Sequence, residues 1–126
     1  MSLPTRPARV LLGDLEPMTR VGMRKWLAEG GVEVVGEVDE PAEIVAESRR
    51  LAPDAVVLAL GDGAGRMLGK QVRGAAPTVT VILWARDETE MEVLEPGTAP
   101  PRRVATGVPD ALLRELTSVS TTRERV

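Results

Sequence analysis

Short aliphatic runs alternate with amphipathic stretches along most of this chain of 126 residues. Ala55–Leu60 is the most continuous of these runs, which predicts a central strand buried on both faces. The other aliphatic runs predict four further strands, at Arg9–Leu12, Val32–Val38, Thr78–Ala85 and Arg103–Thr106.

The stretches between these runs have helical spacing. Helical patterns begin at Pro17 and Pro41 and occupy Arg66–Gly74, Asp87–Leu94 and Pro109–Ser118. Proline is accepted in a first helical turn, and Gly30-Gly31 ends the first helix. The fourth helix is expected to be short or disordered, because the proline-rich segment after Leu94 cannot continue it.

Five strand–helix units predict an α/β fold, with a five-stranded parallel sheet flanked by helices on both faces. In such sheets the functional crevice lies beyond the carboxyl ends of the strands. We predict a disordered N-terminal arm at residues 1–7 and one domain at residues 8–118. Residues 119–126 form either a tail or the start of a linker or DNA-binding domain.

The composition excludes several kinds of chemistry. The chain has no Phe and no Tyr, so its core must be aliphatic apart from Trp26 and Trp84. It also has no His and no Cys, which removes the usual general base, the usual zinc ligands and any disulfide. We therefore expect no enzymatic activity, no cofactor and no bound metal.

The net charge of -3 argues against direct nucleic-acid binding by this segment, which would need a basic face. DNA contact is expected only through a C-terminal domain that this chain lacks. No apolar run approaches the roughly 20 residues of a membrane span, and the N-terminus carries no signal-peptide core. These patterns predict a cytoplasmic protein with no membrane partner.

Several segments resemble a known family, in the right order and at the right spacing. They are Arg9-Val10-Leu11-Leu12-Gly13-Asp14-Leu15-Glu16-Pro17, Val34-Val35-Gly36-Glu37 and Pro53-Asp54-Ala55-Val56-Val57-Leu58. They resemble the first three strands of receiver domains in LuxR/NarL-type response regulators of two-component signal transduction. The resemblance runs from about Arg9 to about Leu116 and implies a CheY-like, or flavodoxin-like, fold.

A working receiver transfers a phosphoryl group to its own aspartate. It uses two acidic residues to hold Mg²⁺, a Thr or Ser on the fourth strand and a Lys on the fifth. Carried onto this sequence, the nucleophile falls on Ala59, the acidic pair on Gly13 and Asp14, the Thr or Ser on Trp84 and the Lys on Thr106. The resemblance thus implies a non-phosphorylatable pseudo-receiver, because a methyl group cannot accept a phosphoryl group.

Each of these residues also has a plain structural interpretation. Asp14 is either a remnant of the acidic pair or a strand-end carboxylate that caps a turn. Trp84 either fills the space left by the lost acids or stacks on a ligand. Asp62 is interpreted as a turn residue rather than a substitute phosphoacceptor. The glycine-rich loop at residues 61–65 lacks the Gly-Lys-Ser/Thr of a P-loop and does not follow the first strand.

Two functional hypotheses follow from the resemblance, and a third class is disfavoured. The first is a regulatory or dimerisation domain of a transcription regulator. The second is a small-molecule sensor, because Leu15, Ala59, Ala85 and Trp84 would line a mostly apolar crevice. An enzyme is disfavoured, since there is no Gly-x-Ser-x-Gly and no paired carboxylates at the strand ends.

The closing segment, residues 121–126, resembles the Leu-Thr-x-Arg-Glu start of a LuxR-type helix-turn-helix domain, although a charged tail is an equal interpretation. If the resemblance holds, a DNA-binding domain follows, and a homodimer on symmetric DNA is expected. The first and last predicted helices offer the dimer face, at Met18, Val21, Leu112 and Leu116.

Overall fold

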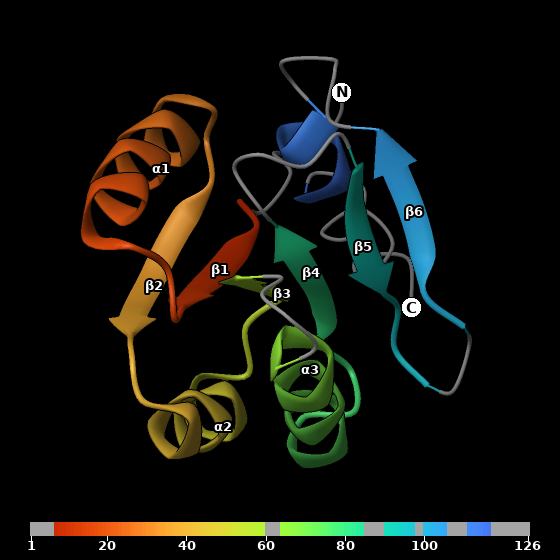
Figure 1. Cartoon of the computed structure of the whole chain (residues 1–126). Helices are drawn as coiled ribbons and strands as arrows, with labels where there is room; N and C mark the ends of the chain where they lie inside the picture. The colour runs from red at the N-terminus through yellow and green to blue at the C-terminus, as the bar shows by residue number, and fades with distance from the viewer. Residues whose placement is uncertain (1–6, 60–63, 85–89, 98–99, 106–110, 117–126) are drawn as a thin grey trace, which may run out of the picture.

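A computed structural model of the chain describes residues 7–59, 64–84, 90–97, 100–105 and 111–116. The described residues form a six-stranded sheet in the order β2-β1-β3-β4-β5-β6, with helices on both faces (Figure 1). The predicted α/β class is therefore confirmed. The predicted count of five strands is wrong, as is the expectation that all of them are parallel.

The first four strands form the parallel part of the sheet. They are β1 (Arg9–Gly13), β2 (Glu33–Val38), β3 (Ala55–Ala59) and β4 (Thr80–Trp84). The central position of β3, between β1 and β4, is confirmed, and Ala55 to Leu58 are buried. This burial on both faces explains why β3 is a continuous aliphatic run rather than an alternating one.

The last two strands differ from the prediction. β5 (Glu90–Leu94) lies within the segment expected to be the short fourth helix. It pairs antiparallel with β4, and β6 (Arg102–Ala105) pairs antiparallel with β5. The hairpin connection of Glu95–Pro101 is too short for the helical crossover that a parallel fifth strand requires. We refer to β5 and β6 together as the β5–β6 hairpin.

Each of the first three strands is followed along the chain by a helix: α1 (Pro17–Glu29), α2 (Pro41–Leu51) and α3 (Ala64–Ala75). Pro17 and Pro41 each lie at the start of their helix, as predicted. At the end of α2, Ala52 adopts the left-handed conformation with a φ of 45°. The Arg9 guanidinium, through Nη1, donates to the Leu51 carbonyl (3.0 Å) and so satisfies one of the exposed carbonyls at this helix end.

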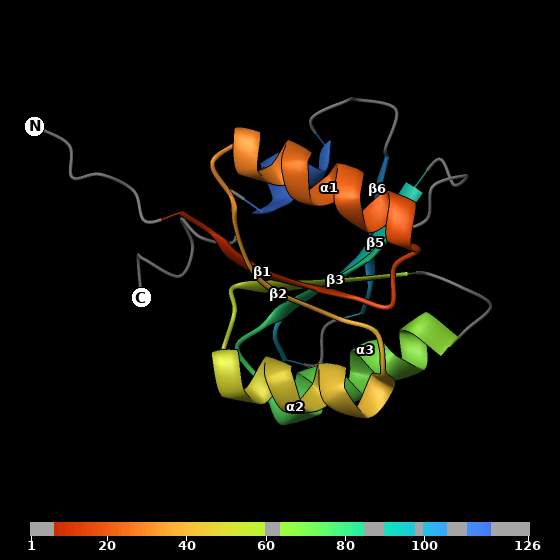
Figure 2. The ribbon, with the colours of Figure 1, turned by 90° about the vertical axis from the view of Figure 1, so that its left-hand side faces the viewer.

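The sheet separates the core into two layers, and helices cover each of them (Figure 2). On one face, α1 and the helical residues 111–116, called helix 111–116 below, pack against the sheet. The buried residues of this face include Leu12, Leu27, Val57, Ile82, Met91, Val93, Leu112 and Leu116. On the other face, α2 and α3 pack over Leu11, Ile44, Val56, Leu58, Leu68, Val72, Leu83 and Leu94.

Some predictions lie outside the described residues. These are the N-terminal arm up to residue 6, Asp62 and the loop before α3, Ala85, Thr106 and the tail after residue 116. Within the described part of the chain, no helix combines the length and the apolar character needed to cross a bilayer.

Candidate functional site: the carboxyl edge of the sheet

Three of the predicted site residues end neighbouring strands on one edge of the sheet. Gly13 ends β1, Ala59 ends β3 and Trp84 ends β4. The register pairs Gly13 with Leu58 and Ala59 with Trp84, so the three positions lie side by side. The structure therefore brings together the positions where the resemblance places a metal ligand, a nucleophile and a phosphoryl contact. Thr106, the predicted Lys position, is not among the described residues.

Gly13 faces the core rather than open solvent. A Cβ at this position would lie 2.7 Å from Leu58 Cδ2 and 3.0 Å from Ile44 Cδ1. The stem of an acidic side chain would start between these two buried aliphatic groups, where an unpaired carboxylate is strongly disfavoured. The prediction that position 13 faces the pocket is therefore wrong, because the α2 side of the core already fills its surroundings.

Asp14 is the acidic residue that directly follows β1. It is exposed and adopts the left-handed conformation with a φ of 53°, which Asp tolerates better than most residues. Its amide donates to the Val38 carbonyl (3.0 Å), which joins the turn to the end of β2. The next residue, Leu15, is buried in the core on the α1 face. The turn after β1 thus presents the Asp14 carboxylate at this edge, and Glu16, the last residue before α1, is exposed as well.

Ala59 and Trp84 are both half-buried and pack against the core on the α1 face. Ala59 is the β3 neighbour of Trp84, and both side chains pack against the core on the same face of the sheet. An indole offers one N–H donor and no acceptor, and a methyl group offers neither. At the ends of β3 and β4 this edge therefore presents apolar surface, where the resemblance would place a nucleophile and a hydroxyl.

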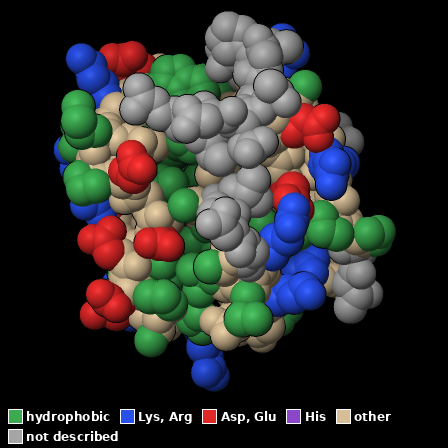
Figure 3. All heavy atoms as spheres, viewed as in Figure 1, with side chains coloured by type: hydrophobic (Ala, Val, Ile, Leu, Met, Phe, Trp, Pro, Cys, Tyr) green, Lys and Arg blue, Asp and Glu red, His purple; other side chains and the backbone are tan. Residues whose placement is uncertain are grey.

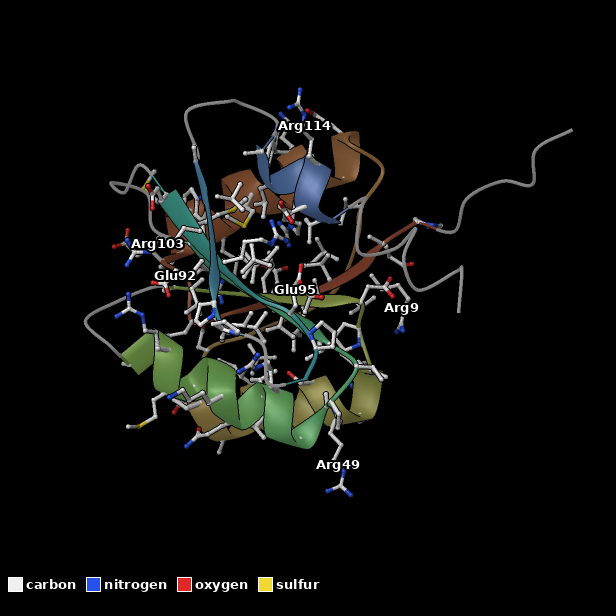
Figure 4. The ribbon with its side chains drawn as sticks, turned by 90° about the vertical axis from the view of Figure 1, so that its right-hand side faces the viewer. Arg9, Arg49, Glu92, Glu95, Arg103 and Arg114 are labelled. Atoms are coloured by element: carbon white, nitrogen blue, oxygen red, sulfur yellow. The ribbon has the colours of Figure 1, made fainter. Side chains whose placement is uncertain are left out.

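A charged pair lies next to this apolar edge, on the α3 face. The Arg66 Nε donates to both carboxylate oxygens of Glu92, at 3.1 and 3.0 Å, and Nη2 also contacts Oε2. Glu92 is buried on β5 as the neighbour of Leu83. The hydrogen bonds to Glu92 raise the pKa of Arg66. Figure 4 shows Glu92 and Arg103 at the same end of the hairpin. Sequence reasoning missed this pair, because it assigned Glu92 to a helix.

A concavity lies at the end of β2, one strand away from the predicted pocket. It has a volume of about 440 Å³ and is lined by Glu37, Val38, Asp39, Glu40, Glu43, Ala46 and Glu47. Figure 3 shows acidic side chains gathered on this side of the molecule. Several of them are paired with arginine, as in the bonds from Arg20 to Asp39 and from Arg24 to Glu37. In the described part of the chain, no group of three or more acidic residues is arranged to hold a metal ion.

The predicted dimer face divides into exposed and buried residues. Met18 and Val21 on α1 are 86% and 57% exposed. Leu112 and Leu116 are 4% and 0% exposed, because helix 111–116 turns them into the core of the same chain. The prediction that these two leucines face a partner is therefore wrong, whereas Met18 and Val21 remain candidates.

Two solved structures are similar to this one. A two-component response regulator of the LuxR family from Aurantimonas sp. SI85-9A1 matches with a TM-score of 0.53 and 28% sequence identity, over 60% of this chain and 56% of that one. The signal receiver domain of the response regulator NarL from Mycobacterium tuberculosis matches with a TM-score of 0.53 and 30% identity, over 61% of this chain and 64% of that one. The matches thus span less than two thirds of either relative.

The chain therefore has the fold of response-regulator receiver domains, and the resemblance to LuxR/NarL-type receivers is confirmed at that level. This fold supports a regulatory domain of signal transduction as the class of protein. No protein-family model and no curated protein matches the chain.

Proposed function

We propose that this chain is a pseudo-receiver: a non-enzymatic, non-phosphorylatable regulatory domain of a bacterial transcription regulator, acting in the cytoplasm. One observation carries the proposal. The residue at the end of β3, where the resemblance places the phosphorylated aspartate, is Ala59, and its neighbour on β4 is Trp84.

The surroundings of Ala59 support the same conclusion. Mg²⁺ prefers several oxygen ligands in near-octahedral geometry. Asp14 supplies one carboxylate after β1, while Leu58 and Ile44 occupy the surroundings of position 13. Without an acidic residue at position 13 or 15, Asp14 lacks the adjacent carboxylate that would help to fix the geometry of a phosphoryl donor, on which this transfer depends.

The direct test incubates the protein with acetyl phosphate and Mg²⁺ and measures its intact mass. We expect no covalent phosphate at any time point. A receiver known to accept phosphate from the same donor serves as the positive control. Phosphate gained by this chain, located by peptide mapping, would overturn the proposal whichever residue carried it.

We further propose that the domain forms a homodimer through α1, and that DNA is contacted only by a C-terminal domain beyond this chain. The exposed Met18 and Val21 support this face, because large apolar side chains at such exposure are favoured at interfaces. Met18→Glu should shift a dimer seen by light scattering toward monomer. Met67→Glu is the matched control, because Met67 is 66% exposed on α3, which covers the other face of the sheet. A monomer at high concentration in the wild type would contradict the dimer.

Ligand sensing is the alternative, and the half-buried pair of Ala59 and Trp84 favours it. An apolar edge with one nearby carboxylate, on Asp14, suits a small organic molecule. A ligand that binds only the folded state raises the melting temperature. A screen of metabolites by thermal shift should therefore find a compound whose effect disappears in Trp84→Leu and persists in Trp26→Leu. If the screen finds no such compound, the regulatory and dimerisation role is the better proposal.

A further inference from the structure

Arg102, the first residue of β6, joins three parts of the chain. Its Nη1 donates to Glu115 Oε1 at 2.9 Å, and its Nη2 donates to Glu115 Oε2 at 2.9 Å and to Glu95 Oε1 at 3.0 Å. Glu115 lies on helix 111–116, and Glu95 directly follows β5. One guanidinium thus ties the loop end of the β5–β6 hairpin to a helix on the α1 face of the sheet.

The geometry of this contact is specific. Two parallel N–H···O bonds to one carboxylate form the planar, bidentate arrangement that arginine favours. The hydrogen bonds to Glu115 are the main reason that the pKa of Arg102 is raised. The Glu115 side chain is 17% exposed, so solvent competes for it less than for Glu95, which is 53% exposed.

Helix 111–116 is anchored beneath this contact by apolar packing. Leu112 and Leu116 are buried in the core, and Leu113 packs so closely on Gly30 that a Cβ there would lie 2.7 Å from Leu113 Cδ2. Val104 of β6 packs against the same core. The hairpin and the helix therefore pack on the same hydrophobic core, and Arg102 adds a polar contact between them.

We propose that Arg102 is an ionic latch that couples the β5–β6 hairpin to helix 111–116. Residues 117–126 follow this helix directly, so the latch would transmit a change at the hairpin toward the C-terminal end of the chain. The latch rests on the proposed regulatory role of the domain, but it needs neither phosphate nor metal.

A latch must be weak enough to open. Partly exposed ion pairs contribute little to the free energy of the closed state. Losing one corresponds to a roughly two- to fivefold change in a local opening equilibrium. A partner or ligand that binds one arrangement better by that factor is enough to shift the population. The apolar packing of Leu112 and Leu116 holds the fold, while Arg102 sets how tightly the two elements move together.

Amide hydrogen exchange measured by mass spectrometry tests the latch in the whole chain, without acetyl phosphate or Mg²⁺. Arg102→Met keeps an unbranched aliphatic stem and removes both ion pairs. Arg103→Met is the matched control, because Arg103 is exposed on the same strand and lies on the α3 face, as the cross-strand neighbour of Glu92 (Figure 4). Glu115→Gln weakens the same contact from the helix side and guards against a folding defect specific to Arg102→Met.

We expect Arg102→Met and Glu115→Gln to speed exchange in the hairpin and in helix 111–116 by roughly two- to fivefold, with β1 to β3 unchanged. Arg103→Met should leave helix 111–116 as in the wild type. Unchanged exchange in helix 111–116, or an equal rise across the whole chain, would overturn the latch.

Coupling itself is tested by a second step. Glu95→Gln perturbs only the hairpin side of the contact, and it should speed exchange of helix 111–116 in the wild-type background but not in the Arg102→Met background. Equal effects in both backgrounds would show that Arg102 does not carry the coupling. None of these results depends on whether Ala59 can be bypassed as a phosphoacceptor, so the latch and the pseudo-receiver proposal fail separately.

Discussion

Strands β1, β3 and β4 bury nearly every residue, whereas β6 leaves three of its four residues exposed. The parallel part is held by aliphatic side chains from α1, α2 and α3, at roughly 25 cal/mol for each Å² of apolar surface removed from water. The β5–β6 hairpin adds charged contacts at Glu92, Glu95 and Arg102. One sheet thus combines a rigid hydrophobic scaffold with an edge whose contacts are weaker and sensitive to salt.

The largest expected difference between the two regions comes from truncating one aliphatic side chain in each. Leu58→Ala on β3 should lower the free energy of unfolding by about 2–5 kcal/mol, because Leu58 is fully buried and its loss leaves a cavity. Val104→Ala on β6 should cost less than about 1 kcal/mol, because Val104 is only partly buried. Urea denaturation measures both changes. Equal losses would contradict the division into scaffold and edge.

Glycine substitutions sharpen the same comparison within the scaffold. Gly13→Ala should lower the free energy of unfolding by about 1–3 kcal/mol, because the new methyl group would displace Leu58 and Ile44. Gly22→Ala on α1 is the matched control, since no side chain and no other element of the fold lies within 4 Å of its added Cβ. It should raise stability by up to about 1 kcal/mol through helix propensity. A neutral Gly13→Ala would mean that this end of β1 is loosely packed.

The smallest expected effect concerns a charge on the surface of the scaffold. Arg50 hydrogen-bonds to Glu47 on α2 and lowers the pKa of that carboxyl. A lowered carboxyl pKa favours the folded state above the ordinary pKa, and this contribution disappears as the pH falls through the lowered value. NMR titration should find the Glu47 midpoint below the usual range, and Arg50→Gln should return it there. Because both groups are solvent-exposed, stability should barely change.

The scaffold was predictable from the sequence because its signals are local. The aliphatic run Ala55–Leu60 predicts a strand buried on both faces, which the structure confirms as β3. Pro17 and Pro41 predict the starts of two helices, and the structure confirms both. The hairpin was not predicted, although a signal is present. Glu90-Met91-Glu92-Val93 alternates polar and apolar residues with the period of a half-buried strand. This alternation predicts a strand, whereas the regular order of strands and helices along the chain predicts a helix here, and the helix is the wrong prediction.

The candidate site was predictable as a set of strand ends, but not in its side-chain directions. The order of the strands brings Ala59 and Trp84 together, as the sequence implies. Three-dimensional packing decides that position 13 faces the core and that Leu112 and Leu116 are buried. The ion pairs of Arg66 and Arg102 join residues that are 26 and 13 positions apart, and no local pattern specifies them.

The most direct test of the central claim, that the edge around Ala59 has lost phosphoryl chemistry as a whole, is the response of Ala59→Asp to acetyl phosphate and Mg²⁺. The substitution restores a carboxylate at the end of β3 but leaves Asp14 without an acidic neighbour and leaves Trp84 in place. We expect the intact mass of the folded variant to stay unphosphorylated. Stoichiometric phosphorylation at position 59 would contradict the claim, because it would show that the site lacks nothing but its nucleophile.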